Sequence, residues 1–264
     1  MLRQRIITAV ILAALVIGAI FWLPSNITAG VITALLLAGA WEWSGFLGLK
    51  HIAVRLGYVL LIAACMAFVW SHGIESTRAN QLLPAALIWW SVALVWVISM
   101  PGHVNRGSAA LAGILVLVPA WLAILRLHQT APYWLFFLLL LVVAADVGAY
   151  FAGRQFGKHK LAPKVSPGKT WEGVGGGIIA SALMALIGTT VFSVEMAPFI
   201  LVCAIVVIAS IVGDLTESLF KRHAGLKDSG NLLPGHGGVL DRIDSVTAAA
   251  PIFLLGMEQL GLLP

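Results

Sequence analysis

The stretch MAPFILVCAIVVIASIVGDLTE, residues 196 to 217, decides the class of fold. Its first 18 residues carry no charge, and a helix needs about 20 predominantly apolar residues to cross a bilayer. The stretch ends in two acids, Asp214 and Glu217, which lie three residues apart and so share one face of a helix. It therefore predicts a transmembrane helix with carboxylates at one end.

The whole chain has the composition of this stretch. Of its 264 residues 60% are hydrophobic and only 10% are charged, and the mean hydropathy is +0.99. A soluble globule cannot bury so much apolar surface, and the same figures exclude a disordered chain, a coiled coil and a disulfide scaffold. Cys65 and Cys203 each lie in an apolar run, which indicates packing residues with no disulfide or zinc role.

The apolar runs predict an all-α, polytopic integral membrane protein with about nine transmembrane helices. Eight or ten spans remain open, because several boundaries are soft. The predicted spans are residues 6–23, 27–47, 56–72, 82–100, 107–125, 132–152, 174–194, 196–217 and 245–263.

The net charge of +5 follows the predicted topology. With a cytoplasmic amino terminus, 14 of the 16 basic residues fall in inner loops and only Arg78 and Arg126 fall in outer loops. This partition is what the positive-inside rule demands. The basic character is therefore explained by orientation, and nucleic acid is not an expected partner.

Four acids occur within or at the edge of predicted spans: Glu42, Asp146, Asp214 and Glu217. An ionised side chain at mid-bilayer costs about 2.5 to 3.5 kcal/mol on insertion scales, so each needs a partner, a cavity or an interfacial position. Glu42 stands between two tryptophans, and we expect it to be an interface anchor.

Asp241 and Asp244 repeat the three-residue spacing where the last span begins. Two carboxylate pairs can thus converge from facing helix ends, and oxygen ligands without cysteine suit a hard cation such as Mg²⁺. The alternative is that the acids form interfacial salt bridges with Lys221, Arg222 and Arg242.

Residues 164–172, KVSPGKTWE, contain Gly-Lys-Thr but are not expected to form a nucleotide P-loop. The earlier glycine of that motif is replaced by Pro163, and no strand is expected before it. A rigid turn remains that offers Lys169 and backbone amides to an anion, and a helix beginning near Thr170 adds its positive end. The alternative is a basic loop that only sets orientation.

A second polar segment, residues 218–244, contains Gly235-His236-Gly237-Gly238, which allows close approach of backbone to a ligand. His236 is interpreted as a proton carrier, a hydrogen-bond donor to phosphate or a turn residue.

At these residues the sequence resembles the phosphatidate cytidylyltransferase, or CDP-diacylglycerol synthase, family. The resemblance rests on 218–222 (SLFKR), 227–230 (KDSG) and 233–244 (LPGHGGVLDRID). Residues 146–151 (DVGAYF) and 166–172 (SPGKTWE) also look like family segments. The match covers roughly residues 140 to 245, and the amino-terminal half agrees only in hydropathy.

The resemblance implies an enzyme that joins CTP to phosphatidate, giving CDP-diacylglycerol and pyrophosphate, with a divalent metal. It also implies a homodimer and a metal site on Asp214 and Asp241, to which we add Asp146. We expect Mg²⁺, and a second, monovalent cation is left open. The expected domains are a scaffold of about five spans, 1–130, and a catalytic region, 131–264, with cytoplasmic loops 153–172 and 218–244.

The expected catalytic residues are Asp214, Asp241, Asp244, Lys169, Lys221 and Arg222. The expected substrate-binding residues are Ser166, Lys164, Thr170, Lys227, Asp228, His236, Gly237, Gly238 and Arg242. One substrate is soluble and the other is a membrane lipid, so the site is expected at the cytoplasmic face of the cell inner membrane. The alternatives are a secondary transporter with an acidic cation relay and another lipid-phosphate transferase.

Overall fold

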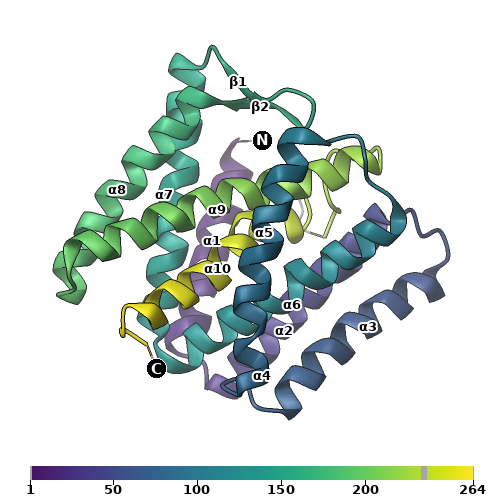
Figure 1. Cartoon of the computed structure of the whole chain (residues 1–264), viewed down its shortest axis with the longest axis horizontal. Helices are drawn as coiled ribbons and strands as arrows, with labels where there is room; N and C mark the ends of the chain where they lie inside the picture. The colour runs from purple at the N-terminus through teal and green to yellow at the C-terminus, as the bar shows by residue number, and fades with distance from the viewer. Residues whose placement is uncertain (1, 233–236, 264) are drawn as a thin grey trace.

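The computed structural model describes residues 2–232 and 237–263, and it is a bundle of helices with one small β-ribbon (Figure 1). The helices of the first half are α1 (Leu2–Phe21), α2 (Ser25–Phe46), α3 (Ile52–Ser71), α4 (Thr77–Asn80), α5 (Leu82–Ser99) and α6 (Arg106–Thr130). Those of the second half are α7 (Pro132–Phe156), α8 (Trp171–Phe192), α9 (Met196–His223) and α10 (Leu240–Gln259).

The all-α membrane class is confirmed. Among the described residues, seven helical segments are long and apolar enough to cross a membrane: α2, α3, α4 with α5, α6, α7, α8 and α9. The count of nine spans and the orientation of the amino terminus stay predictions.

Helices α7 and α8 pack against each other along a seam of small residues. A β-carbon on Gly148 would lie 2.5 Å from the carbonyl oxygen of Gly176, and one on Gly177 would lie 2.9 Å from that of Ala145. Such close approach of two backbones is how small residues stabilise helix pairs in lipid. The seam fixes the end of α7 against the start of α8.

A similar contact joins α9 to α10. A β-carbon on Gly213 would lie 2.6 Å from the carbonyl oxygen of Asp244 and 3.0 Å from Cβ of Ala248. The glycine therefore lets the two helices meet where each carries an acid.

Two short antiparallel strands, β1 (Lys160–Ala162) and β2 (Ser166–Thr170), lie at one end of the bundle (Figure 1). The expectation that no strand precedes the Gly-Lys-Thr sequence is wrong. The segment lies beyond the helix ends, where its backbone groups need partners, and pairing of Lys160 with Thr170 supplies them. The buried side chain of Val165, beside Leu215 and Leu219, fastens the ribbon to α9.

The prediction that Arg126 lies in an outer loop is wrong. Arg126 lies inside α6 and is only 6% exposed. Its Nη2 is 2.6 Å from Oε1 of Glu258, and its Nη1 donates to Oδ1 of Asn80 at 2.7 Å. These partners allow the charge to be buried, since a buried charge is tolerated when it is paired.

Candidate active site

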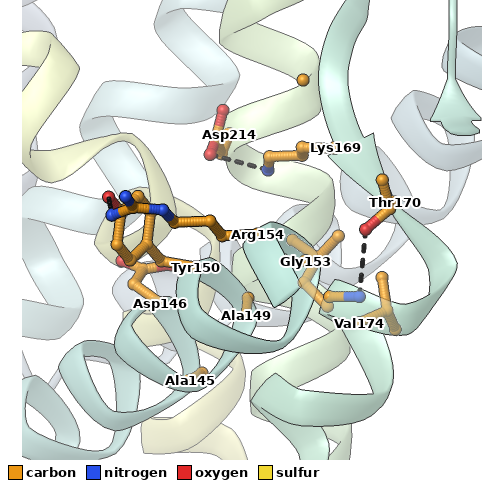
Figure 2. A pocket seen from close by; sticks show the side chains of 13 residues that line it. Ala145, Asp146, Ala149, Tyr150, Gly153, Arg154, Lys169, Thr170, Val174 and Asp214 are labelled. Atoms are coloured by element: carbon orange, nitrogen blue, oxygen red, sulfur yellow. Dashed lines mark hydrogen bonds and ion pairs between the residues drawn. The ribbon is translucent and has the colours of Figure 1, made fainter. Parts of the chain in front are cut away.

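A cavity of about 460 Å³ opens between α7, the β2–α8 junction and α9 (Figure 2). Its walls carry Asp146 from α7, Lys169 from β2 and Asp214 from α9, together with Tyr150 and Arg154. Lys169 belongs to the predicted loop 153–172, whereas Asp146 and Asp214 lie in the adjoining helices α7 and α9. The predicted segment 218–244 meets the first loop where Nε of Arg222 donates to the carbonyl oxygen of Val165 at 3.3 Å.

Lys169 and Asp214 form the central contact of this cavity. Nζ of Lys169 lies 2.6 Å from Oδ2 of Asp214, and both side chains are about a quarter exposed. The next residue, Thr170, caps α8 by accepting a hydrogen bond from the amide of Gly173 at 3.1 Å, so the helix begins where the motif predicts. The cap fixes Lys169 at the positive end of α8.

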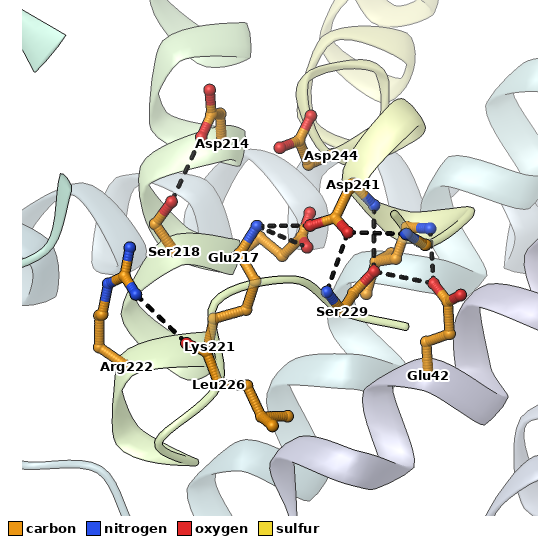
Figure 3. A network of polar contacts seen from close by, with 12 residues as sticks. Glu42, Asp214, Glu217, Ser218, Lys221, Arg222, Leu226, Ser229, Asp241 and Asp244 are labelled. Atoms are coloured by element: carbon orange, nitrogen blue, oxygen red, sulfur yellow. Dashed lines mark hydrogen bonds and ion pairs between the residues drawn. The ribbon is translucent and has the colours of Figure 1, made fainter. Parts of the chain in front are cut away.

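A second cluster surrounds Lys221, which is buried at 8% exposure (Figure 3). Its Nζ donates to Oδ1 of Asp241 at 2.7 Å and lies 3.1 Å from Oε1 of Glu217. The ammonium therefore joins an acid of α10 to an acid of α9. The distance to Glu217 makes an ion pair, but neither Glu217 oxygen accepts a well-formed hydrogen bond among the described residues.

The other oxygen of Asp241 is held by backbone. Oδ2 accepts hydrogen bonds from the amides of Ser229 and Gly238, each at 2.9 Å. The preceding Gly237 has φ +81°, and a β-carbon there would lie 2.9 Å from the same oxygen. The positive φ and the close approach both require glycine at 237.

Asp244 lies between the two clusters. Its Oδ1 accepts a hydrogen bond from the amide of Ser245 at 2.6 Å. Asp214 is within electrostatic range of Asp244 and also of Asp146, and Figure 3 shows Asp214 and Asp244 on neighbouring helices. Asp146 and Asp214 therefore line the cavity, and Asp244 lies on the helix next to Asp214.

The fit of this site to Mg²⁺ depends on which ligands a nucleotide supplies. Within residues 2–232 and 237–263, no three His, Cys, Asp or Glu side chains form a group able to hold a metal ion by themselves. Mg²⁺ is usually bound by one or two carboxylates plus substrate phosphates. Asp214 and Asp146 meet that requirement, and the ammonium of Lys169 now lies against Asp214 as a cation would.

The predicted ligand role of Asp241 is harder to combine with its contacts. Its two oxygens already receive three donors, from Lys221, Ser229 and Gly238. Metal binding would require Asp241 to exchange at least one of them, so its role as a ligand stays a prediction.

Glu42 is not an interface anchor, and that expectation is wrong. It is 2% exposed, and its carboxylate accepts hydrogen bonds from Ser229 and from the amides of Val239 and Leu240. The carboxylate is buried because these donors replace water. Sequence reasoning missed this contact, since nothing in the residues around Glu42 identifies partners almost 200 positions away.

The remaining basic residues of the prediction are spread around the site. Arg222 links the two segments by donating to the carbonyl oxygens of Val165 and Leu226, each at 3.3 Å. Arg242 is exposed and within electrostatic range of Asp146.

The other predicted substrate residues lie on the ribbon and the long loop. Lys164 lines a separate, mainly apolar cavity of about 710 Å³ between α5, the ribbon, α8 and α9. Ser166 begins β2, while Lys227 and Asp228 are exposed. His236 lies outside the described residues.

Comparison with known proteins extends the likeness to nearly the whole chain. A model of the cytidylyltransferase family matches residues 3–260. A phosphatidate cytidylyltransferase of Pseudomonas aeruginosa is 45% identical over 276 residues, covering 96% of each chain. One of Haemophilus influenzae is 43% identical over 281 residues, covering 96% of this chain and 97% of its own. One of Staphylococcus saprophyticus is 32% identical over 241 residues, covering 90% of this chain and 80% of its own.

These matches correct the expectation that the amino-terminal half agrees only in hydropathy. Together with the cavity that holds Asp146, Lys169 and Asp214, they show that the chain belongs to the cytidylyltransferase family and is a nucleotidyltransferase.

Proposed function

We propose that the protein transfers the cytidylyl group of CTP to phosphatidate, giving CDP-diacylglycerol and pyrophosphate for phospholipid synthesis. The observation that carries the proposal is the cavity in which Lys169 meets Asp214 beside Asp146, in a chain whose relatives carry that activity in their names. We propose the cytoplasmic face of the inner membrane as the place of the reaction, because a soluble nucleotide and a lipid headgroup can both reach a site there.

The proposed reaction is an in-line displacement. The phosphate of phosphatidate is mostly dianionic at neutral pH because the second pKa of a phosphomonoester is about 6, so it needs little help from a base. One of its oxygens forms a bond to the α-phosphorus of CTP. The bond from that phosphorus to the bridging oxygen breaks, and pyrophosphate leaves with the electron pair.

The difficulty of this step is the repulsion between two anions. Lys169 lies at the cavity wall and Lys221 is fixed at the neighbouring cluster, so both can neutralise phosphate charge. Arg222, Lys227 and Arg242 are placed around the same end of the bundle, where they serve the leaving pyrophosphate and the lipid headgroup. Asp244 completes the acidic side of the site.

Asp214 and Asp146 would hold Mg²⁺ together with the nucleotide phosphates. When bound, the ion supplies charge neutralisation and orientation of the phosphates. A second, monovalent cation and a homodimer also stay predictions.

The direct test is incubation of membranes containing the protein with labelled CTP, phosphatidate and Mg²⁺. We expect a lipid-soluble cytidine product and one pyrophosphate for each lipid formed. ATP or UTP in place of CTP should give no lipid product, and consumption of another nucleotide would instead indicate a different lipid-phosphate transferase. Absence of any lipid-linked nucleotide would contradict the proposal and favour the alternative of a secondary transporter.

Lys169→Ala tests whether the Gly-Lys-Thr segment takes part in this reaction. Removing the ammonium beside Asp214 should lower kcat/KM about a hundredfold, as for loss of an electrostatic contact to the transition state. Lys160→Ala is the matched control, because Lys160 is exposed on the same ribbon. If both variants instead lost only expression or membrane orientation, and to the same extent, the segment would be a basic loop that only sets orientation.

A further inference from the structure

Glu42 provides a contact between the amino-terminal half and the site. Its Oε2 accepts from Oγ of Ser229 at 2.9 Å and from the amide of Leu240 at 2.8 Å. Its Oε1 accepts from the amide of Val239 at 3.0 Å. Three donors from one loop and one helix start therefore converge on a single carboxylate of α2 (Figure 3).

Two of these donors are the amide of Val239, the N-cap residue of α10, and the amide of Leu240, its first residue. The first amides of a helix have no hydrogen-bond partner within the helix. The side chain of the N-cap residue Val239 supplies none for α10. A carboxylate at a helix amino terminus satisfies such amides and is stabilised by the helix dipole. Glu42 thus caps α10 from a different helix.

The surrounding backbone is shaped to admit this carboxylate. A β-carbon on Gly230 would overlap Oε1 of Glu42, and one on Gly238 would overlap Oε2 of Glu42 and Oγ of Ser229. Both glycines are in the segment that carries the family motif. The carboxylate of Glu42 occupies the space beside both glycines, and Oγ of Ser229 shares the space beside Gly238.

The contacts continue from Glu42 to the site. Ser229 donates its hydroxyl to Glu42, its amide donates to Asp241, and its Oγ accepts from the amide of Asp241 at 3.3 Å. Asp241 in turn holds Lys221 at 2.7 Å. One hydrogen-bonded chain therefore runs from α2 through the loop to the basic side chain of α9.

We infer that Glu42 is a positioning residue for the transferase reaction, acting through Ser229 and the start of α10 to align Asp241 with Lys221. This inference rests on the proposed function. It predicts that loss of the carboxylate lowers the turnover rate while the remainder of the bundle stays folded.

The test is Glu42→Gln, which keeps the shape but turns one oxygen into an NH₂ that faces N–H or O–H donors. We expect kcat to fall between about tenfold and a hundredfold, the effect of a small misplacement in a positioned site, with KM for CTP unchanged. Glu258→Gln is the matched control. It alters a half-buried carboxylate near the other end of α10, about 25 Å away along the helix, and should leave kcat unchanged.

Amide hydrogen exchange gives a readout that does not depend on activity. Glu42→Gln should accelerate exchange at residues 229–241, while Glu258→Gln should not. Ser229→Ala should also lower kcat, and it should add little in the Glu42→Gln background because both act through one chain of contacts.

The outcomes separate the alternatives. The inference would be overturned if Glu42→Gln kept the wild-type kcat and the wild-type amide exchange. It would also be overturned if Glu42→Gln and Glu258→Gln lowered kcat equally. If Glu42→Gln does not fold, full activity of Ser229→Ala would overturn it instead. An inactive wild-type protein would refute the proposed function alone, since the exchange experiment would still decide whether Glu42 orders the loop.

Discussion

Lys221 shows at the scale of one residue how this site tolerates charge in a largely apolar protein. Its ammonium is buried between Asp241 and Glu217, which belong to different helices. A buried charge that loses its partner is strongly destabilising. The lysine therefore fixes the relative position of α9 and α10.

Asp241→Asn tests this arrangement at the residue scale. The amide would weaken the contact to Lys221 and would place an NH₂ near the amides of Ser229 and Gly238. We expect Mg²⁺-dependent pyrophosphate release from CTP plus phosphatidate to fall at least about a hundredfold. Helical circular dichroism and elution as a folded species should be retained.

The control for this variant is Glu195→Gln, which alters an exposed acid where α9 begins, at the other end of that helix from Lys221. It should behave as wild type. Retained turnover in Asp241→Asn would remove Asp241 from the mechanism.

At the scale of elements, the seam between α7 and α8 decides whether Asp146 and Lys169 face one cavity. Asp146 lies two residues before Gly148, and Lys169 lies just before the start of α8. The cavity geometry therefore depends on how closely these two helices approach.

Gly176→Ala is expected to separate the helices. The new β-carbon would overlap Cβ of Ala152 and the carbonyl oxygen of Gly148. Overpacking of this kind costs about 1 to 3 kcal/mol, so the midpoint of thermal unfolding in detergent should fall together with activity. Gly175→Ala, whose β-carbon meets nothing within 4 Å, should leave both unchanged. If the two variants had the same unfolding midpoint and the same activity, the close packing of α7 against α8 would not determine the cavity geometry.

The sequence predicts the long helices well, because a run of apolar residues near 20 has few other stable forms in lipid. It misses the β1–β2 ribbon, since that segment contains Pro163, Pro167 and Gly168 and has no strand-like alternation. It also places the end of α6 too early, because Arg126 reads as a loop residue until Glu258 and Asn80 are seen beside it.

At the scale of the whole molecule, the polar chemistry lies at one end of the bundle and the Arg126–Glu258 pair lies near the far end of α10. The site was partly predictable. The apolar runs around Asp146 and Asp214 identify these acids as unusual, and the Gly-Lys-Thr turn identifies Lys169. Glu42 was not, because its donors are up to 198 positions away and no local pattern encodes such a contact.

The predicted orientation is testable by labelling of single cysteines with a membrane-impermeant maleimide. His223→Cys and Lys160→Cys, both exposed near the site, should react only when the cytoplasmic face is accessible. Glu75→Cys, exposed in the loop between α3 and α4, should react from the opposite face. Labelling of all three from one face would refute the topology.

The span between Glu42 and Leu240 has a consequence for biosynthesis. The ribosome makes Glu42 first, and its three donors follow 187 to 198 residues later. Until then the carboxyl group of Glu42 in α2 lacks these three hydrogen-bond donors. Glu42 can therefore reach all three partners only after the chain has been made as far as Leu240, so the order of synthesis delays this link between α2 and α10.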